Sequence, residues 1–370
     1  MTRKQADSPV TESACLPIGL SPCPRDAAGG LSLAGTLRYD THIRLRRTSP
    51  PDAVFHFRPF RNSDPPRIAE IWRDQPPQRG LMQPVTPGIL EQLVFAKPYF
   101  DPNGLIMLLS DDVPIGFVHA GFGANDSETD IDTSMGTIYQ LMLRADRRND
   151  ALADELVRHA EEYLRSRGAK VLYGGGIRPL NAFYLGLYGG SELPGVLVGD
   201  PMLGAACLRN GYREIDRVNI LQLELARFRP PVNRSLRLLR RELASREVYC
   251  PPARSRWEAY TIGDFERIRF SLAPGNGPPL AEVDFWDIEP LSTRWGVATA
   301  GMFDLRVAGE RRRQGLATYL LLEAFERLRN RGIALVEAQT MQSNAPALAL
   351  YEKLGFEKVD EGVVYRKDGA

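Results

Sequence analysis

The clearest alternation of hydrophobic and polar positions lies near the C-terminus of the chain. Phe303, Leu305 and Val307 alternate with polar residues, which is typical of a half-buried strand. After the polar turn AGERRRQG, apolar residues recur at spacings of three and four, which predicts a helix ending at Arg331-Gly332. The run IALVEAQT then predicts a second strand. The apolar face of the predicted helix consists of Ala317, Leu320, Leu321, Ala324, Phe325 and Leu328.

The first half of the chain shows the same order of elements. The segment TIYQLMLRADRRNDALADELVRHAEEYLRSRGAKVLYGGG predicts a strand, a turn, a helix and a strand. Before it, VFHFRPF predicts a strand from Val54, two helical segments follow, and an apolar hairpin turns about Asp111-Asp112. Residues 1–50 are rich in Pro, Gly, Ser and Thr without periodicity, and we expect a disordered leader there.

Four anchor positions recur in the two halves at almost one offset. It is 164 residues for the arginine of the turn and for the glycine after the helix, and 163 for a later asparagine and tyrosine. A constant offset is typical of a duplicated unit. We therefore predict two tandem domains, 51–228 and 229–370, after the leader. The pairs are Arg148 and Arg312, Gly168 and Gly332, Asn181 and Asn344, and Tyr188 and Tyr351.

The segment RFRPPVNRSLRLLRREL contains the predicted boundary. Pro230-Pro231 interrupts the chain, and Asn233 is expected to cap a helix with leucines on one side. Seven arginines against one glutamate occur from residue 227 to 246. A helix that packs its leucines and leaves its arginines in solvent is the favoured interpretation, and a nucleic-acid site is the alternative. The leucines are Leu236, Leu239 and Leu243.

Residues 247–302 are compressed relative to the corresponding part of the first half. Here AEVDFWDIEPLSTRWG is expected to form a strand pair ahead of the core strand.

Composition and charge narrow the function classes. Hydrophobic residues make up 43% of the 370 residues and charged residues 25%, which is typical of a globular protein. The net charge is +1, so the overall charge does not favour binding to nucleic acid or to an acidic membrane. The four cysteines lack paired C-x-x-C spacing, so we expect no metal site, no disulfide framework and a cytoplasmic location. No apolar run approaches the roughly 20 residues of a membrane span, and no signal peptide is expected.

The turn before the C-terminal helix is the main candidate for chemistry. It reads Arg312, Arg313, Gln314, Gly315, Leu316 and Ala317, which places a glycine and a small residue where the helix begins. Unpaired amides of a first helical turn and the helix dipole attract anions. The turn is either a pyrophosphate cradle or a solvated turn with arginines in water.

Later motifs favour the cradle. Arg312-x-x-Gly315-x-Ala317, then Asn344, then Tyr351-Glu-Lys-Leu-Gly-Phe resemble, in order and spacing, the acetyl-CoA-binding core of the GNAT superfamily of N-acetyltransferases. The resemblance implies an α/β fold with a mixed sheet in each of two tandem GNAT-like domains. It also implies acetyl-CoA as acyl donor, held by this turn and by Asn344. Asn344 has two compatible roles, as the cap of its helix and as a contact of the pantetheine arm.

The first-half copy of the turn is degenerate. Ala151 stands where Gly315 stands in the second half, and Asp150 adds a negative charge where a pyrophosphate would bind. The insertion YGGSELPGVLVGDPMLG leaves the counterpart of Tyr351 ambiguous between Tyr188 and Cys207. We therefore expect no active site in the first half.

The family resemblance assigns further roles. Tyr351 is the candidate acid for the leaving thiolate, and amides of Leu305, Arg306 and Val307 are candidates for polarising the thioester if the strand splays there. The second half contains no histidine, so the candidate bases are carboxylates, Asp287, Glu289 and Asp304, or an ordered water.

These predictions together describe an N-acetyltransferase whose C-terminal domain brings acetyl-CoA to a small-molecule or peptide amine. The domain layout is similar to that of mycothiol synthase, although no motif in this sequence indicates the substrate of that enzyme. The alternatives are a non-catalytic acyl-CoA sensor, or a nucleic-acid-associated protein acting through residues 227–246. Membrane partners are not expected.

Overall fold

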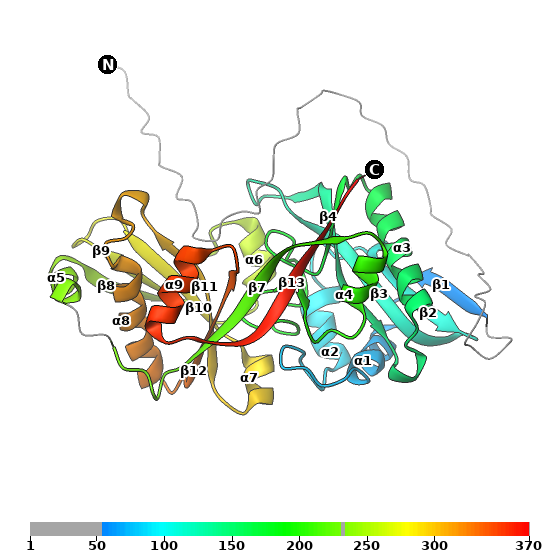
Figure 1. Ribbon diagram of the computed structural model, residues 1–370, viewed down its shortest axis with the longest axis horizontal. Helices are drawn as coiled ribbons and strands as arrows, with labels where there is room; N and C mark the ends of the chain where they lie inside the picture. The colour runs from blue at the N-terminus through cyan, green and yellow to red at the C-terminus, as the bar shows by residue number, and fades with distance from the viewer. Residues whose placement is uncertain (1–53, 231–233, 370) are drawn as a thin grey trace, which may run out of the picture.

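The computed structural model describes residues 54–230 and 234–369, where thirteen strands form one mixed sheet (Figure 1). The strand order is β1-β2-β3-β4-β5-β13-β7-β12-β11-β10-β9-β8, and the short β6 pairs with β13. The leader predicted for 1–50 and the cap predicted at Asn233 lie outside the described residues. The strands are β1 Phe55–Pro59, β2 Leu105–Ser110, β3 Val113–Ala124, β4 Ile131–Leu143, β5 Val171–Gly174, β6 Val196–Leu197, β7 Arg213–Glu224, β8 Ala244–Tyr249, β9 Arg267–Ala273, β10 Ala281–Asp287, β11 Thr299–Val307, β12 Leu335–Met341 and β13 Glu357–Asp368.

The two halves exchange their last strands at the centre of this sheet. The last strand of the second half, β13, pairs with β5 of the first half, and the last strand of the first half, β7, pairs with β12 of the second. The strands β7 and β13 also pair with each other along almost their whole length. Figure 1 shows them side by side in the middle of the molecule. Backbone hydrogen bonds therefore join the halves across three neighbouring strand pairs.

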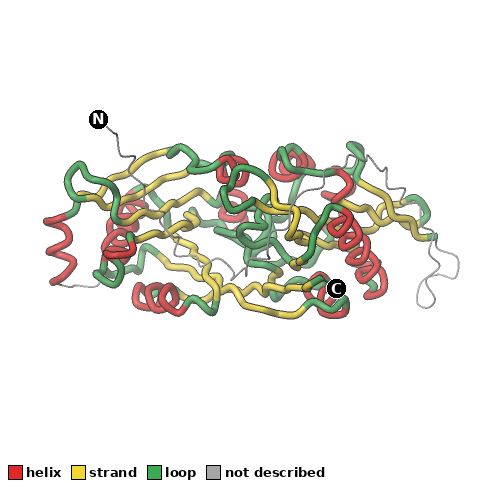
Figure 2. Tube along the Cα trace, turned by 90° about the horizontal axis from the view of Figure 1, so that it is seen from above, coloured by secondary structure: helices red, strands yellow, loops and turns green. Residues whose placement is uncertain are grey.

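Helices cover both faces of the sheet, so the molecule has three layers (Figure 2). The helices α3 and α4, and in the second half α8 and α9, pack on one face. The helices α1, α2, α6 and α7 pack on the other face. The helices are α1 Pro65–Arg73, α2 Pro87–Leu90, which continues into a π-helical turn Glu91–Phe95, α3 Asp150–Ser166, α4 Leu203–Arg209, α5 Arg234–Glu242, α6 Arg256–Ile262, α7 Glu289–Trp295, α8 Leu316–Asn330 and α9 Ala345–Leu354; single 3-10 turns lie at Pro102–Gly104, Ala145–Arg147 and Gly309–Arg311.

The helix α8 illustrates how the sequence pattern builds a layer. Its predicted apolar face, from Leu320 to Leu328, is buried against β9, β10, β11 and β12. Burying one such leucine or phenylalanine contributes about 1.5–3 kcal/mol. The helix α5 packs beside it through Leu239 and Leu243, while Arg237, Arg240 and Arg241 are exposed. That arrangement is the favoured interpretation of the arginine-rich segment.

One predicted element is wrong in part. Residues 281–287 form a strand, as expected, but the second strand of the predicted pair is the helix α7. Pro290 stands in its first turn, where a proline costs no hydrogen bond, and Gly296 ends it in a left-handed conformation with φ 70°. Both are ordinary signals of a short helix.

Candidate active site

The strands β11 and β12 part from each other halfway along β11. Their parallel ladder joins Thr299–Met302 to Leu335–Ala338, although β11 continues to Val307. The opening between residues 303–307 of β11 and the end of β12 from Gln339 is called the fork below. The amides of Leu305, Arg306 and Val307, predicted to polarise a thioester, lie on its β11 side.

A β-bulge shapes the β11 side of the fork. Against β10, Glu282 faces Arg306 but Asp284 faces Phe303, so β11 carries one additional residue. Asp304 lies in the bulge with a left-handed φ of 54°. The bulge interrupts the alternation of side chains between the two faces, because Phe303 and Asp304 both line one pocket. Leu305 and Val307 instead join the apolar cluster under α8.

The first turn of α8 lies beyond the end of β11. The helix begins after Gly315, whose φ of 84° is left-handed, and no side chain caps its first amides. In the first half, by contrast, the Asn149 side chain accepts hydrogen bonds from the amides of Ala151 (2.8 Å) and Leu152 (3.3 Å). The first-half turn thus satisfies its own donors, whereas the second-half turn presents them.

The other residues of the predicted cradle surround this turn. Arg312, Arg313 and Gln314 are exposed, Ala317 is half-buried and Leu316 is buried. Arg313 has a left-handed φ of 60°, and the Arg312 guanidinium donates to the carbonyl of Val307 at 3.3 Å. These contacts tie the turn to the end of β11.

The helix α9 contributes the remaining predicted residues. The Asn344 side chain accepts from the amide of Ala347 at 3.3 Å, so the predicted cap is confirmed. Tyr351 is buried, and its ring lies 5.2 Å from that of Phe356. Both α8 and α9 pack on the same face of the sheet.

A pocket opens at the fork on the opposite face of the sheet, between the two halves. The second half contributes α6 and the bulge of β11, and the first half contributes the loop before β4 and the long loop after β5. The sequence pattern did not predict that residues of the two halves would line one pocket. The lining residues are Glu128, Arg178, Asn181, Leu185, Ser191, Glu192, Leu193, Trp257, Glu258, Thr261, Ile262, Phe303 and Asp304.

The long first-half loop is fastened to strands of the second half. The amide of Ser191 donates to Glu337 at 2.7 Å, and its carbonyl accepts from the Trp286 indole at 3.0 Å. The carbonyl of Glu192 accepts from the Gln339 side chain at 2.9 Å. Three hydrogen bonds thus hold the Ser191–Glu192 backbone on β10 and β12.

Gly190 is required for this close approach. A Cβ atom there would lie 1.8 Å from a carboxylate oxygen of Glu337, which is fully buried. We expect Gly190→Ala to lower the free energy of unfolding by about 1–3 kcal/mol, because the loop must move off β12. Urea unfolding measures it. Gly88→Ala, where the nearest neighbour is 4.0 Å away, is the control and should change stability by less than about 0.5 kcal/mol. Equal stability of both variants would contradict the argument.

Asp304 is held by three guanidinium groups. Its carboxylate oxygens lie 2.6 Å from Arg178, 3.0 Å from Arg254 and 3.0 Å from Arg306. Burial raises the pKa of Asp304, but the charges of Arg178, Arg306 and Arg254 outweigh it and hold the pKa below its ordinary value. Asp304 therefore stays ionised at neutral pH and holds a proton poorly.

Glu192 has the opposite character. Burial of the carboxyl raises its pKa from 4.5 to about 7; Arg178 opposes this rise and Asp304 reinforces it. Among the described residues, the Glu192 carboxylate makes no hydrogen bond or ion pair. A carboxyl group of this kind can take up and release a proton near neutral pH.

Of the three carboxylates predicted as bases, only Asp304 lines the pocket. Asp287 and Glu289 are exposed at the start of α7 and do not line it. Sequence reasoning missed Glu192 because it considered only carboxylates of the second half. The signal available was its place in the glycine-rich insertion YGGSELPG, where the two halves differ.

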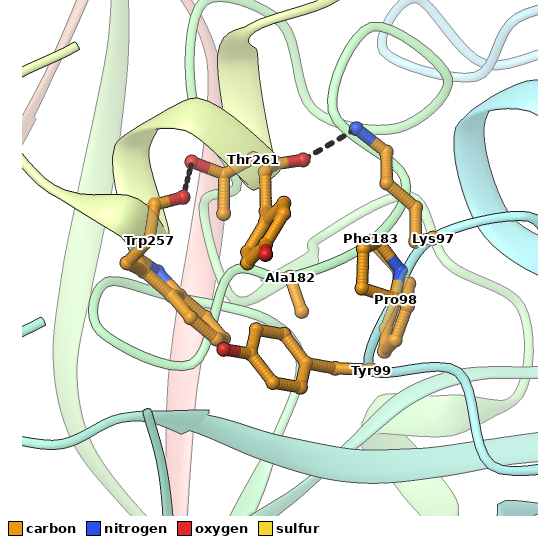
Figure 3. Close-up of a pocket in the computed structure, with 8 residues that line it drawn as sticks. Lys97, Pro98, Tyr99, Ala182, Phe183, Trp257 and Thr261 are labelled. Atoms are coloured by element: carbon orange, nitrogen blue, oxygen red, sulfur yellow. Dashed lines mark hydrogen bonds between the residues drawn. The ribbon is translucent and has the colours of Figure 1, made fainter. Parts of the chain in front are cut away.

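A narrow aromatic slot adjoins the pocket and shares Trp257 and Thr261 with it (Figure 3). The rings of Tyr99 and Trp257 stack with centroids 5.5 Å apart. Lys97 donates to the carbonyl of Tyr260 at 2.6 Å and pairs with Asp264 at 2.8 Å. The first half thereby holds α6, one wall of the pocket, in place.

Among residues 54–230 and 234–369, no group of three or more His, Cys, Asp and Glu side chains could hold a metal ion. None of the helices in these ranges is long and apolar enough to span a bilayer.

Comparison with known proteins identifies the fold. A family model for the acetyltransferase (GNAT) family matches residues 66–188 and 238–356, which is more than half of the chain. A tandem GNAT protein from the clavulanic acid biosynthesis pathway superposes with a TM-score of 0.57 at 16% identity, covering 85% of this chain and 99% of that one. The tandem arrangement predicted from the repeat is confirmed.

Curated relatives match over short segments only. The mycothiol acetyltransferase of Streptosporangium roseum is 47% identical over 53 residues, 14% of this chain and 16% of the relative. The ribosomal protein bS18-alanine N-acetyltransferase of Escherichia coli (strain K12) is 42% identical over 57 residues, 15% of this chain and 38% of the relative.

Proposed function

The chain belongs to the acetyltransferase (GNAT) family, and on that premise we propose that its C-terminal half transfers an acetyl group from acetyl-CoA to a primary amine. The observation that carries the proposal is the uncapped first turn of α8 beside the fork, in contrast to the first-half turn capped by Asn149. In both halves the strand before the helix parts from its parallel partner, but of these two helix-start turns the second-half one alone leaves its first-turn donors uncapped for a pyrophosphate.

The residues at the fork fit the donor. The turn from Arg312 to Ala317 would bind the pyrophosphate, since Gly315 brings no side chain between the backbone and the ligand. Amides of Leu305, Arg306 and Val307 would bind the pantetheine arm or the acetyl oxygen, and Asn344 would contact the same arm. The bound donor supplies an activated thioester.

The acceptor would enter from the opposite face. The pocket between the halves reaches the bulge of β11, so an amine there approaches the thioester through the fork. Holding the two reactants in attack geometry lowers the barrier by several kcal/mol. Asp304 pairs with three guanidinium groups, so its role in this proposal is to hold Arg178, Arg254 and Arg306 at the pocket. Glu289 has no role in the proposed mechanism, because it is exposed and does not line the pocket. The acceptor is the amine of a small molecule or peptide, and a cytoplasmic location remains a prediction.

Calorimetric titration with acetyl-CoA tests the proposal. We expect one binding site per chain. Two sites would show that the capped first-half turn also binds the donor, and no site in a folded sample would overturn the acetyltransferase function.

We expect Tyr351→Phe to slow acetyl transfer by about 10²- to 10⁴-fold, because the phenol is the proposed proton donor to the leaving thiolate. Release of CoA with benzylamine as acceptor measures the rate. Binding of acetyl-CoA, measured by calorimetry, should persist because the lost group is a single hydroxyl. Turnover equal to that of the unchanged protein would remove Tyr351 from the mechanism, and a protein that binds the donor without any turnover would be an acyl-CoA sensor.

A further inference from the structure

We propose that the first half, which lacks a donor cradle, completes the active site of the second half, and that Glu192 takes the proton from the acceptor amine. The inference rests on the proposed acetyl transfer and extends it. The first half then supplies acceptor chemistry and the second half supplies donor binding.

The position of Glu192 follows from the fork itself. The ladder between β11 and β12 ends at the pair Met302 and Ala338. Gln339, which binds the Glu192 carbonyl, is the first residue of β12 past that pair. Phe303, the first residue of β11 past it, lines the same pocket as Glu192. The backbone of Glu192 is therefore fastened at the point where the two strands part.

The rest of the loop makes this position rigid. Glu337 and Trp286 bind the amide and carbonyl of Ser191, the residue before Glu192. Glu337 is in turn bound by Arg79 at 3.3 Å and by Gln222 at 2.8 Å. Residues of both halves therefore hold the loop that carries Glu192 in place.

Charge distinguishes Glu192 from the other acidic residues of the pocket. Glu128 pairs with Arg178 at 3.1 Å, Glu258 pairs with Arg267, and Asp304 binds three guanidiniums. In the described part of the chain, Glu192 is the pocket carboxylate that lacks such a partner. It is the one available to an ammonium group of an acceptor.

The proton and electron balance of the step is complete. The ammonium R–NH₃⁺ gives one proton to the Glu192 carboxylate, and the neutral amine attacks the thioester carbonyl carbon. A C–N bond forms and the C–S bond breaks. The nitrogen loses its second proton to solvent, and the departing thiolate gains a proton from Tyr351. Solvent then reprotonates Tyr351 and takes the proton from Glu192, so one proton is released overall. The products are the N-acetyl amine and CoA.

A pair of acceptor probes isolates the proton transfer. Benzylamine is an ammonium ion at neutral pH and needs a base, whereas O-benzylhydroxylamine is already neutral and has nearly the same shape. We expect Glu192→Gln to lower kcat/KM for benzylamine by about 10²- to 10⁴-fold. Turnover of O-benzylhydroxylamine should be largely retained. Loss of both activities equally, or of neither, would overturn the role of Glu192.

The pH profile supplies a second readout. For benzylamine, kcat/KM of the unchanged protein should rise with pH through an ionisation near 7, because only the carboxylate accepts a proton. The charges that act on Glu192 are those of Arg178 and Asp304, and Glu128 and Glu258 are further carboxylates that line the same pocket. In Glu192→Gln this ionisation near 7 should be absent, and kcat/KM should simply follow the neutral fraction of benzylamine, which grows steadily with pH. Glu128→Gln, a second carboxylate of the same pocket, should keep the ionisation, and the opposite pattern would contradict the assignment.

A stability measurement tests whether Glu192 is needed for folding. The folded-state pKa of Glu192 lies above its ordinary 4.5, so the stability contributed by its protonated form is present below pH 4.5 and is lost as the pH rises through about 7. The melting temperature of Glu192→Gln at pH 8 should therefore be no lower than that of the unchanged protein. A marked decrease would show that Glu192 is structural and would overturn the inference.

The outcomes separate this inference from the proposed function. A protein that binds no acetyl-CoA contradicts the acetyltransferase function itself. A protein that binds acetyl-CoA but acetylates neither probe is the acyl-CoA sensor, which ends the acetyltransferase function and the role of Glu192 together. A protein that acetylates benzylamine and is indifferent to Glu192→Gln keeps the acetyltransferase function and overturns this inference alone.

Discussion

Replacing Gly315 by glutamate should abolish acetyl-CoA binding in calorimetric titrations. The new carboxylate would lie at the start of α8, where the first-turn amides are uncapped and where we place the pyrophosphate. Bringing like charges together costs several kcal/mol, so affinity should fall by at least about 100-fold. The left-handed φ of 84° at this position adds strain for any side chain.

Two matched variants separate charge from strain and from the choice of half. Gly315→Gln carries the same bulk and the same backbone strain without the charge, and it should bind more tightly than Gly315→Glu. Ala151→Glu places the same carboxylate at the corresponding first-half position, which is exposed beside the Asn149 cap. Its binding should equal that of the unchanged protein. Lost binding in Ala151→Glu would place the donor in the first half.

Local features of the site could be predicted from the sequence because they depend on neighbouring residues. The strand through Phe303 to Val307, the turn at Gly315 and the helix after it follow from spacing within about thirty residues. The cap at Asn344 is equally local, since its side chain binds the amide three residues on. The degeneracy of the first-half turn was also visible, although Asn149 rather than Asp150 proved to be the residue that closes it.

Pairing over long distances could not be predicted in the same way. A repeat with a constant offset favours two separate domains, yet β13 pairs with β5 and β7 pairs with β12. Nothing in the periodicity of β7 or β13 distinguishes pairing within a half from pairing across halves. The boundary at 228/229 stays a prediction, because the exchanged strands place backbone of each half inside the sheet of the other.

The place of Glu192, which we propose as the base, escaped prediction for the same physical reason. Glu192 belongs to the first half, and hydrogen bonds from Gln339 and to Glu337 bring its loop to the fork across nearly 150 residues. Proximity in sequence favoured Asp287 and Glu289, but the short helix α7 carries that segment to the surface. An insertion present in one copy of a repeat and absent from the other was the better guide to the pocket between the halves.

Asp304→Asn should lower the free energy of unfolding at pH 7 by about 3 kcal/mol. The change leaves Arg178, Arg254 and Arg306 close together without their shared carboxylate, and breaking a buried ion pair on one side costs about 3–5 kcal/mol. We expect the lower end because Arg178 is partly exposed to solvent, at 34% of its side chain. Urea unfolding measures the effect without screening the charges as a guanidinium salt would.

The pH dependence of this difference carries a definite sign. The folded-state pKa of Asp304 lies below its ordinary 3.8, so the stabilisation is present above that value and is lost as the pH falls through the folded-state pKa. The gap between Asp304→Asn and the unchanged protein should therefore be constant near neutrality and shrink in acid. Asp287→Asn is the matched control, because Asp287 is exposed. Partial desolvation raises the pKa of Asp287, so its charge does not stabilise the fold, and its loss should change the free energy of unfolding by less than about 0.5 kcal/mol. A loss of unfolding free energy at pH 7 no larger than that of the control would mean that the three guanidinium groups are stable without the Asp304 carboxylate. Other contacts would then have to hold the bulge of β11 in its conformation.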